Sequence, residues 1–378
     1  IDKETDMIEF KNVTKKYKNT KVLDNISFVI EKNKITSLIG ESGCGKTTTL
    51  KMINRLIEPT EGEILIDSVN IKKKNVIDLR RSIGYVIQQT GLFSHMTIRQ
   101  NIEIIPRLEK KKEKDIEART KEMLDMVGLK EEYLDRYPTE LSGGQQQRIG
   151  IARAFENNPE IILMDEPFSA LDPLTRSSLQ EELLRLQETY KKTIVFVTHD
   201  MDEAIKISDK IAIMDNGKIV QYDTPEQILK HPANDFVREF VGNKRIWTSP
   251  KLIKVEDIMI TNPVTCRPNF SCFYCLNKMK MSKVDSLMVV DENKKLLGVL
   301  YAEMLTGINY DGKKVSDFIE NDVITTHPKD SIVDVLKLVE ENKLSTMPVV
   351  DKNGILKGLI TRSSLITSLS QQFLEEEK

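Results

Sequence analysis

Long hydrophobic runs are missing from this 378-residue chain. Its apolar stretches, such as Thr193–Thr198, fall far below the ~18 residues that a membrane span needs, which predicts a soluble chain or one that docks on a membrane protein. A basic excess is also missing: 56 lysines and arginines stand against 58 aspartates and glutamates, a net charge of -2, so we expect no nucleic-acid partner. The chain has only four cysteines and no visible signal peptide, which indicates a reducing cytoplasm.

The residues that are present are sufficient for packed cores. Hydrophobic residues make up 39% and charged residues 30% of the chain, and the length predicts two or three domains. From Met7, the first methionine, to about Gly242, apolar runs alternate with longer helix-like stretches. Buried strands of a mostly parallel sheet are predicted at Thr36–Ile39, Ile161–Met164 and Thr193–Thr198. Ile211–Met214 and Lys218–Tyr222 flank the hairpin turn Asn216-Gly217, and 98–134 is predicted to be an inserted helical subdomain with a solvated run at 109–115.

The strongest motif is a P-loop that follows the first of these strands. Its pattern GxxxxGK[ST] spans Gly40, Glu41, Ser42, Gly43, Cys44, Gly45, Lys46 and Thr47, with Thr48 next in the predicted helix. The glycines let backbone N–H groups approach phosphates, Lys46 supplies a positive charge, and the Thr47 hydroxyl is suited to Mg²⁺. A plain glycine-rich turn is the alternative, and the strand before and helix after the motif argue against it.

Polar residues also follow two other predicted strands. Asp165 and Glu166 directly follow Ile161–Met164, which fits an Mg²⁺-organising carboxylate and an adjacent general base for water. His199 follows Thr193–Thr198 and is predicted to contact the γ-phosphate. The alternatives are two surface acids and a packing or surface histidine. Because the carboxyl ends of parallel strands share one edge of a sheet, we expect all three beside the P-loop.

Four further motifs accompany the P-loop: Tyr17, Gln88, Leu141-Ser-Gly-Gly-Gln145 and Ser169-Ala-Leu-Asp172. In order and spacing, the P-loop and these motifs together resemble the ABC-transporter ATPase family. The resemblance covers Met7 to about Gly242 and implies an α/β fold, a P-loop domain with a mixed or parallel sheet and a helical subdomain. It implies that Tyr17 stacks on adenine and that Gln88 senses both Mg²⁺ and the attacking water. The Mg²⁺ ligands that it implies are Thr47, Gln88 and Asp165. It further implies that Ser142, Gly143, Gly144 and Gln145 face the nucleotide of a second subunit and that Asp172 links the two sites.

The chain departs from the family pattern at two positions. Glu41 stands where many importer subunits have proline, outside the fixed glycines and lysine, so we expect no loss of function. Ser94 also replaces a frequent proline, in the segment Leu92–Thr97 where the family docks a permease helix. We therefore expect partner fit to differ there.

An internal repeat follows a predicted linker at 243–254. Residues sixty positions apart match, among them Asp257 and Asp317, Ser271 and Ser331, Val289-Val290-Asp291 and Val349-Val350-Asp351, and Gly298 and Gly358. The repeat resembles a tandem pair of cystathionine-β-synthase (CBS) domains of βαββα type. The predicted boundaries are 7–242 for the ATPase domain, 255–312 and 313–370 for the two CBS domains, and 371–378 for an acidic tail.

The CBS resemblance implies a regulatory module. The nucleotide pattern of such pairs is kept at Gly358-Leu-Ile-Thr361, but Ser364 replaces its aspartate, which disfavours ordinary AMP or ATP and favours cyclic di-AMP or no ligand. Arg362 is the predicted phosphate anchor, Val264 and Leu359 apolar walls, and Ser286 and Thr361 polar contacts. Ionic-strength sensing and a purely structural dimerisation module are the alternatives.

Cys272 and Cys275 form a CxxC pattern, with Cys266 nearby. A metal or redox site is one interpretation. The repeat favours buried thiols, because Cys272 and Cys275 align with Ile332 and Val335, which are apolar helix positions.

An import ATPase followed by CBS domains is similar to the ATPase subunit of osmoprotectant importers for glycine betaine, carnitine or choline. This resemblance implies MgATP hydrolysis by a homodimer at the cytoplasmic face of the membrane, with permease subunits and, indirectly, a solute-binding protein as partners. The chain has one P-loop and one LSGGQ, so a pair of composite sites needs a second copy. Another cargo, such as an amino acid, polyamine or metal complex, is one alternative. A soluble, non-transport ABC ATPase is the other, although the chain lacks the second nucleotide domain or long coiled coil common there.

Overall fold

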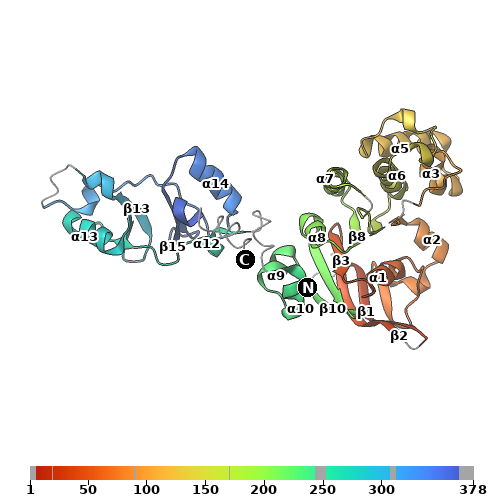
Figure 1. Cartoon of the computed structure of the whole chain (residues 1–378), viewed down its shortest axis with the longest axis horizontal. Coiled ribbons are helices and arrows are strands. Elements are labelled where there is room, and N and C mark those ends of the chain that lie inside the picture. The colour runs from red at the N-terminus through yellow and green to blue at the C-terminus, as the bar shows by residue number, and fades with distance from the viewer. Residues whose placement is uncertain are drawn as a thin grey trace. The chain divides into compact units, whose positions relative to one another are not determined.

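The computed structural model describes residues 6–18, 20–88, 91–169, 171–242, 253–306 and 312–365. The chain divides into two compact units, Ile1–Val241 and Gly242–Lys378 (Figure 1). Most of the predicted linker and the whole predicted acidic tail lie outside the described residues. None of the helices in the described ranges is long and apolar enough to cross a bilayer.

The first unit contains two β-sheets and their covering helices. Its strands are β1 Asp6–Tyr17, β2 Thr20–Glu31, β3 Ile35–Gly40, β4 Glu61–Ile66, β5 Val69–Asn70, β6 Ile83–Val86, β7 Ile161–Asp165, β8 Thr193–Thr198, β9 Lys210–Asp215 and β10 Lys218–Asp223. Its helices are α1 Lys46–Ile53, α2 Val76–Arg81, α3 Ile98–Ile102, α4 Ile104–Leu108, α5 Glu113–Met126, α6 Gly143–Glu156, α7 Pro173–Tyr190, α8 Met201–Ile207, α9 Pro225–Lys230 and α10 Asp235–Val241.

The larger sheet has the order β10-β9-β3-β8-β7-β6, with only β10 antiparallel to its neighbour. The three predicted strands fall within β3, β7 and β8, and every residue of these strands is buried, because helices cover both faces of a parallel sheet. The predicted hairpin is β9–β10, and both turn residues, Asn216 and Gly217, have positive φ as a type I′ turn requires. The prediction of the central sheet is thus confirmed.

A second, antiparallel sheet with the order β2-β1-β4-β5 was not predicted as a separate layer. Along β2, the buried residues Leu23, Ile26, Phe28 and Ile30 are separated by more exposed ones, the pattern of a sheet with one face in the core. Phe10 and Phe28 stack on this face with ring centroids 4.6 Å apart. They share a hydrophobic core with Leu50 of α1 and Leu163 of β7, which fixes the P-loop helix between the two sheets.

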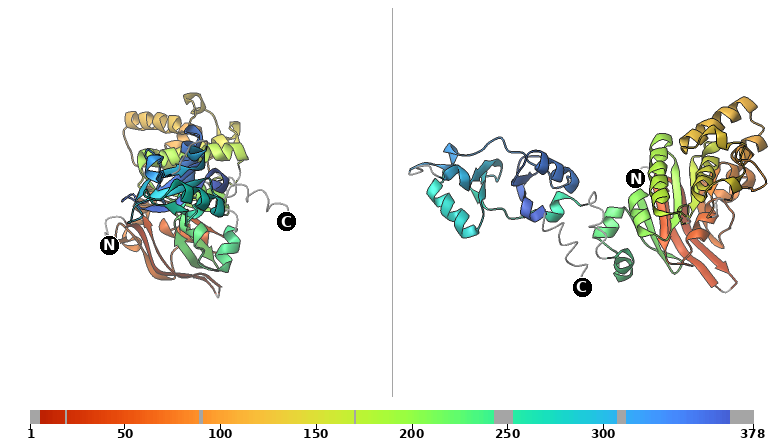
Figure 2. Two further views of the ribbon diagram at one scale, coloured as in Figure 1. Left: turned by 90° about the vertical axis from the view of Figure 1, so that its left-hand side faces the viewer. Right: turned by 45° about the horizontal axis from the view of Figure 1, so that its top comes forward.

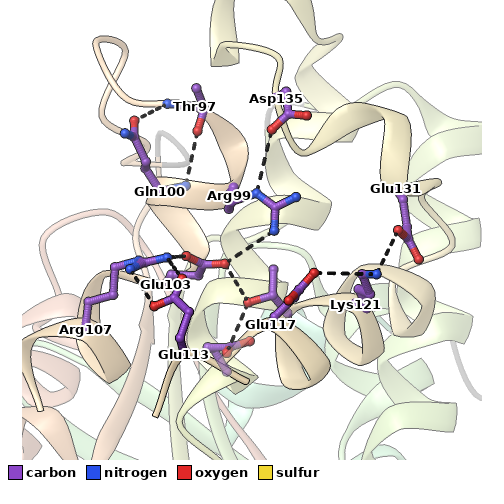
Figure 3. Close-up of polar contacts among 12 residues, drawn as sticks. Thr97, Arg99, Gln100, Glu103, Arg107, Glu113, Glu117, Lys121, Glu131 and Asp135 are labelled. Carbon is purple, nitrogen blue, oxygen red and sulfur yellow. Dashed lines mark hydrogen bonds and ion pairs between the residues drawn. The ribbon is translucent and has the colours of Figure 1, made fainter. Parts of the chain in front are cut away.

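The predicted helical subdomain is present as α3, α4 and α5, and α6 packs against it (Figures 1 and 2). Thr97 caps α3 in a reciprocal pair with Gln100. The carboxylate of Glu103 is buried and accepts two hydrogen bonds from Arg107, which also contacts Glu113 at the surface (Figure 3). Run 109–115 is exposed as predicted, although α5 already begins within it at Glu113.

The second unit repeats one motif twice, as the sequence predicts. The elements of this unit are α12 Val255–Ile258, β11 Thr265–Cys266, α13 Cys272–Ser282, β12 Ser286–Val290, β13 Leu296–Tyr301, 3₁₀ turns at Ala302–Leu305 and Val315–Asp317, α14 Ile332–Glu341, β14 Thr346–Val350 and β15 Leu356–Thr361. Ser271 and Ser331 cap the two equivalent helices, α13 and α14. The two hairpins also share their register, with Val289 opposite Gly298 and Val349 opposite Gly358.

Each repeat is completed by the segment that precedes the other repeat. Val255 of α12 packs in the core of the second repeat with Ile332, and Val315 packs in the core of the first repeat with Cys272. This exchange explains the glycine at 358. A Cβ there would lie 2.7 Å from Met259 Sδ and 3.0 Å from the Ile260 carbonyl oxygen of the exchanged segment. Each compact core therefore contains residues from both sequence repeats, 255–312 and 313–370.

The three cysteines of the first repeat are buried free thiols. The hydrogen bond with Cys275, together with burial, raises the pKa of Cys266. Among the residues that the structure describes, no group of three or more His, Cys, Asp or Glu side chains is arranged to hold a metal. The buried-thiol interpretation of the CxxC pattern agrees with this packing.

Candidate functional site

The P-loop joins the end of β3 to the start of α1 and lines a pocket of about 470 Å³. Gly45 adopts φ 107°, a conformation that favours glycine, and a Cβ there would lie 2.5 Å from Leu23 Cδ2 and 3.0 Å from the Val22 carbonyl oxygen. The Lys46 ammonium donates to the carbonyl oxygens of Gly40 at 2.8 Å and Glu41 at 2.7 Å. The pocket is lined by Val22, Ser42, Gly43, Gly45, Lys46, Thr47, Thr48, Glu166 and His199.

Asp165 ends β7 beside the first turn of α1. The Thr47 hydroxyl donates to Asp165 Oδ1 at 2.9 Å, and only 5% of Asp165 is exposed. The second carboxylate oxygen, Oδ2, lies 3.8 Å from the ammonium of Lys51. A hydroxyl and a carboxylate are oxygen donors of the kind that Mg²⁺ prefers, so these two side chains fit the ion.

Glu166 follows in a left-handed conformation with φ 48°, which is uncommon for a residue other than glycine. Its backbone N–H donates to the Val197 carbonyl oxygen at 3.1 Å, which ties this turn to β8. Its Oε2 accepts a hydrogen bond of 2.9 Å from Gln88 Nε2 and lies 3.7 Å from His199 Nδ1. The structure therefore brings together three residues that are distant in the sequence, Gln88, Glu166 and His199.

Known proteins are similar to this chain over nearly its whole length. The ABC transporter family matches residues 23–169, and the CBS domain family matches 255–307 and 315–371. The carnitine transport ATP-binding protein OpuCA of Listeria monocytogenes is 49% identical over 362 residues, covering 95% of this chain and 91% of that protein. The chain belongs to the ATP-binding subunits of ABC transporters that carry CBS domains.

Further similarities agree with this membership. The choline transport ATP-binding protein OpuBA of Bacillus subtilis is 47% identical over 375 residues, covering 98% of both chains. A dimeric ATP-binding cassette in a post-hydrolysis state, bound to ADP and Pi, is 36% identical with a TM-score of 0.54, covering 58% of this chain and 99% of that one. This ABC ATP-binding subunit is an ATPase, as its sequence predicts.

Several predicted site residues of the ABC subunit lie outside the pocket lining. Tyr17 is 46% exposed at the end of β1, with the Lys15 ammonium 4.8 Å from its ring centroid. Ser142 caps α6: its hydroxyl accepts from the Gln145 backbone N–H at 3.3 Å, and Gln145 Oε1 accepts from the Ser142 N–H at 2.9 Å. A Cβ on Gly143 would meet no atom within 4 Å, whereas one on Gly144 would lie 2.6 Å from Thr175 Cγ2 of α7.

Asp172 also serves as a helix cap in the ABC subunit. Its carboxylate accepts a hydrogen bond of 3.1 Å from the Thr175 backbone N–H at the start of α7. Hydrogen bonding from Thr175 lowers the pKa of this carboxyl. The carboxylate is therefore charged at neutral pH at an exposed helix N-terminus.

The predicted regulatory residues are distributed over both CBS repeats. Val264 packs against the core of the first repeat, and the buried Ser286 donates to Asp285 at 3.1 Å. Leu359 packs against Met288 and Val299 of the other repeat, so one predicted wall residue does lie between the two.

The remaining two regulatory candidates lie at the end of β15. The Thr361 hydroxyl accepts from the Ser364 N–H at 3.0 Å, so Ser364 belongs to a local cap. Arg362 is exposed, and its Nε donates to the Leu344 carbonyl oxygen at 2.8 Å.

Two further residues belong to this region but were not predicted from the sequence, Val22 in the pocket lining and Lys51 beside Asp165. Val22 lines the pocket from β2, and the signal for it is the strand alternation that sends Leu23 to the opposite face. Lys51 contacts Asp165, and the signal for it is its position one helical turn after Thr47.

Proposed function

We propose that this ABC ATPase powers the uptake of a quaternary amine such as glycine betaine, carnitine or choline. The observation that carries the proposal is the likeness to carnitine and choline transport ATP-binding proteins across both units of the chain. Similarity restricted to the ATPase domain would leave the cargo open, because the P-loop pocket contacts nucleotide and not solute.

Within the pocket, Glu166 is the general base that takes a proton from the attacking water. Gln88 holds its Oε2 and His199 lies beside it, which fits a role at the γ-phosphate. Thr47 and Asp165, with Gln88, hold Mg²⁺, which when bound neutralises charge on the phosphates. Lys46 exchanges its two carbonyl partners for phosphate oxygens, and Tyr17 stacks on adenine. Backbone N–H groups of 40–48 cradle the phosphates.

The catalytic site is shared between two copies of the chain. Ser142, Gly143, Gly144 and Gln145 lie at the N-terminus of α6 outside the pocket of their own chain, where the helix dipole favours a γ-phosphate from a partner. Asp172 at the N-terminus of α7 links the two sites. Permease subunits contact the chain near Leu92–Thr97, where Ser94 modulates the fit. They place the homodimer on the cytoplasmic face of the membrane, and a solute-binding protein delivers the cargo.

Reconstituted uptake tests the cargo. Proteoliposomes with the chain, its permease subunits and its solute-binding protein should accumulate labelled carnitine, choline or glycine betaine only with internal ATP. Uptake of an amino acid or a polyamine in place of all three would contradict the proposed substrate class. The same vesicles with Lys46→Ala serve as the control, because they lack the phosphate counter-charge.

The CBS module is the regulatory part of the same subunit. Arg362 is exposed directly after β15 and its guanidinium is suited to a bidentate contact with a phosphate, so cyclic di-AMP is the proposed ligand. A bound dinucleotide acts only through its differential affinity for two arrangements of the module. Ionic-strength sensing is the second candidate, since it needs no ligand and tolerates the loss of the aspartate at Ser364.

A further inference from the structure

The environment of Asp165 contains a cation that is separate from the P-loop lysine. Lys46 donates to the carbonyl oxygens of Gly40 and Glu41, so its charge is directed into the loop. Lys51, on the next turn of α1, lies 3.8 Å from Asp165 Oδ2. Among the described residues, Lys51 is the one cationic side chain within ion-pair distance of this carboxylate.

Burial makes this contact important for the protein without metal. The side chain of Asp165 is 8% exposed and that of Lys51 is 36% exposed. A buried carboxylate without a counter-charge is strongly unfavourable. The Tyr85 hydroxyl nearby is buried and has no hydrogen-bond partner, and its pKa is raised by burial and by the Asp165 charge. Because the Tyr85 hydroxyl makes no hydrogen bond to Asp165, the groups that stabilise this carboxylate are Thr47 and Lys51.

Thr47 and Lys51 lie four residues apart on α1, on the same face of the helix. Each approaches a different oxygen of Asp165, Oδ1 and Oδ2 respectively. The carboxylate is thus held from both sides before any metal arrives. A divalent cation at the same carboxylate meets the positive charge of Lys51 at short range.

We propose that Lys51 is a positioning residue that neutralises Asp165 in the metal-free site and competes with Mg²⁺ for that carboxylate. Lys51 thereby weakens Mg²⁺ binding and favours release of the metal after hydrolysis. The proposal rests on the Mg²⁺ site of the proposed function, and it concerns the affinity for the ion rather than the chemical step.

The test measures Mg²⁺ binding without turnover. Mg²⁺ is titrated into the full chain with a fluorescent, non-hydrolysable ATP analogue. The variants are wild type, Lys51→Met, Lys51→Arg and, as the control, Lys114→Met at an exposed position of α5. Lys51→Met should lower the half-saturating Mg²⁺ concentration, because it removes the charge that competes with the ion. The decrease should be about three- to tenfold, since the charge of a partly exposed lysine is screened by solvent. Lys51→Arg should restore the wild-type value, and the control should match it.

Thermal unfolding gives a second readout. Lys51→Met should lower the midpoint in EDTA, because Asp165 loses its counter-charge, and the difference should close with saturating Mg²⁺ and analogue. Lys51→Gln replaces Lys51→Met if the latter does not fold. An unchanged or raised Mg²⁺ requirement overturns the Lys51 proposal alone. Wild type without any Mg²⁺-dependent analogue binding overturns the proposed function as well.

Discussion

Gln88 Nε2 donates to Glu166 Oε2 at 2.9 Å, which joins the segment after β6 to the end of β7. The segment after Gln88 leads to Leu92–Thr97, the proposed permease contact. One hydrogen bond therefore connects the proposed catalytic base with the chain that leads to the transport partner.

Glu166→Gln should reduce ATP hydrolysis by ~10²–10⁴-fold, the usual contribution of a general base. ATP binding should remain, because the amide keeps the shape and can still accept the bond from Gln88. Steady-state phosphate release and nucleotide titration measure the two effects, with Glu188→Gln at an exposed position of α7 as the control. Hydrolysis near the wild-type rate would assign the base to another residue.

Mixing two inactive variants tests whether the site is shared. Lys46→Ala disrupts the phosphate pocket, and Ser142→Ala removes the hydroxyl that caps α6. A mixed dimer contains one site with both defects and one with neither, so part of the ATPase activity should return if one intact site suffices. Each variant alone is the control. Activity that never exceeds the sum of the separate variants would speak against a shared site.

Arg362→Ala should weaken cyclic di-AMP binding by the full chain, measured by calorimetry, because a phosphate loses its bidentate partner. Lys337→Ala on α14, an exposed cation of the same repeat, should bind like wild type. Two results together would favour ionic-strength sensing: the wild-type chain binds no dinucleotide, and removal of the module abolishes the salt dependence of uptake. If removal of the module changes neither uptake nor its regulation, the module has only a structural role.

Glu156 should make stability depend on pH. Its Oε2 is buried without a hydrogen-bond partner, and burial raises its pKa from 4.5 to about 7. The folded state therefore retains a proton that the unfolded state loses above pH 4.5. The stabilisation is complete below the unfolded pKa and is lost as pH rises through about 7.

Glu156→Gln should flatten this dependence and stabilise the protein above pH 7 by up to about 3 kcal/mol, the free energy that corresponds to the shift. Unfolding midpoints at about pH 5.5 and about pH 8 measure it, with the exposed Glu132→Gln as the control. Equal midpoint changes for Glu156→Gln at both pH values would show that Glu156 is not the titrating group.

The sequence by itself determined the P-loop turn, three strands of the central sheet, its hairpin and the two repeats. Glycines, a lysine and a threonine at fixed spacing specify a P-loop because local backbone geometry requires them. Three apolar runs favour buried strands, because each is as short as a strand and a parallel sheet covered on both faces hides every side chain. The sixty-residue offset gave the two repeats, since equivalent caps and hairpins recur at equivalent positions.

The tertiary structure alone decided which distant residues meet. No local pattern places Gln88 against Glu166, because strand order in the sheet, rather than position in the chain, sets this distance. The same holds for the exchanged segments of the CBS repeats, where Val255 completes the core of the second repeat and Val315 that of the first. A hydrophobic pattern specifies that a residue is buried, and only the folded chain specifies against what it packs.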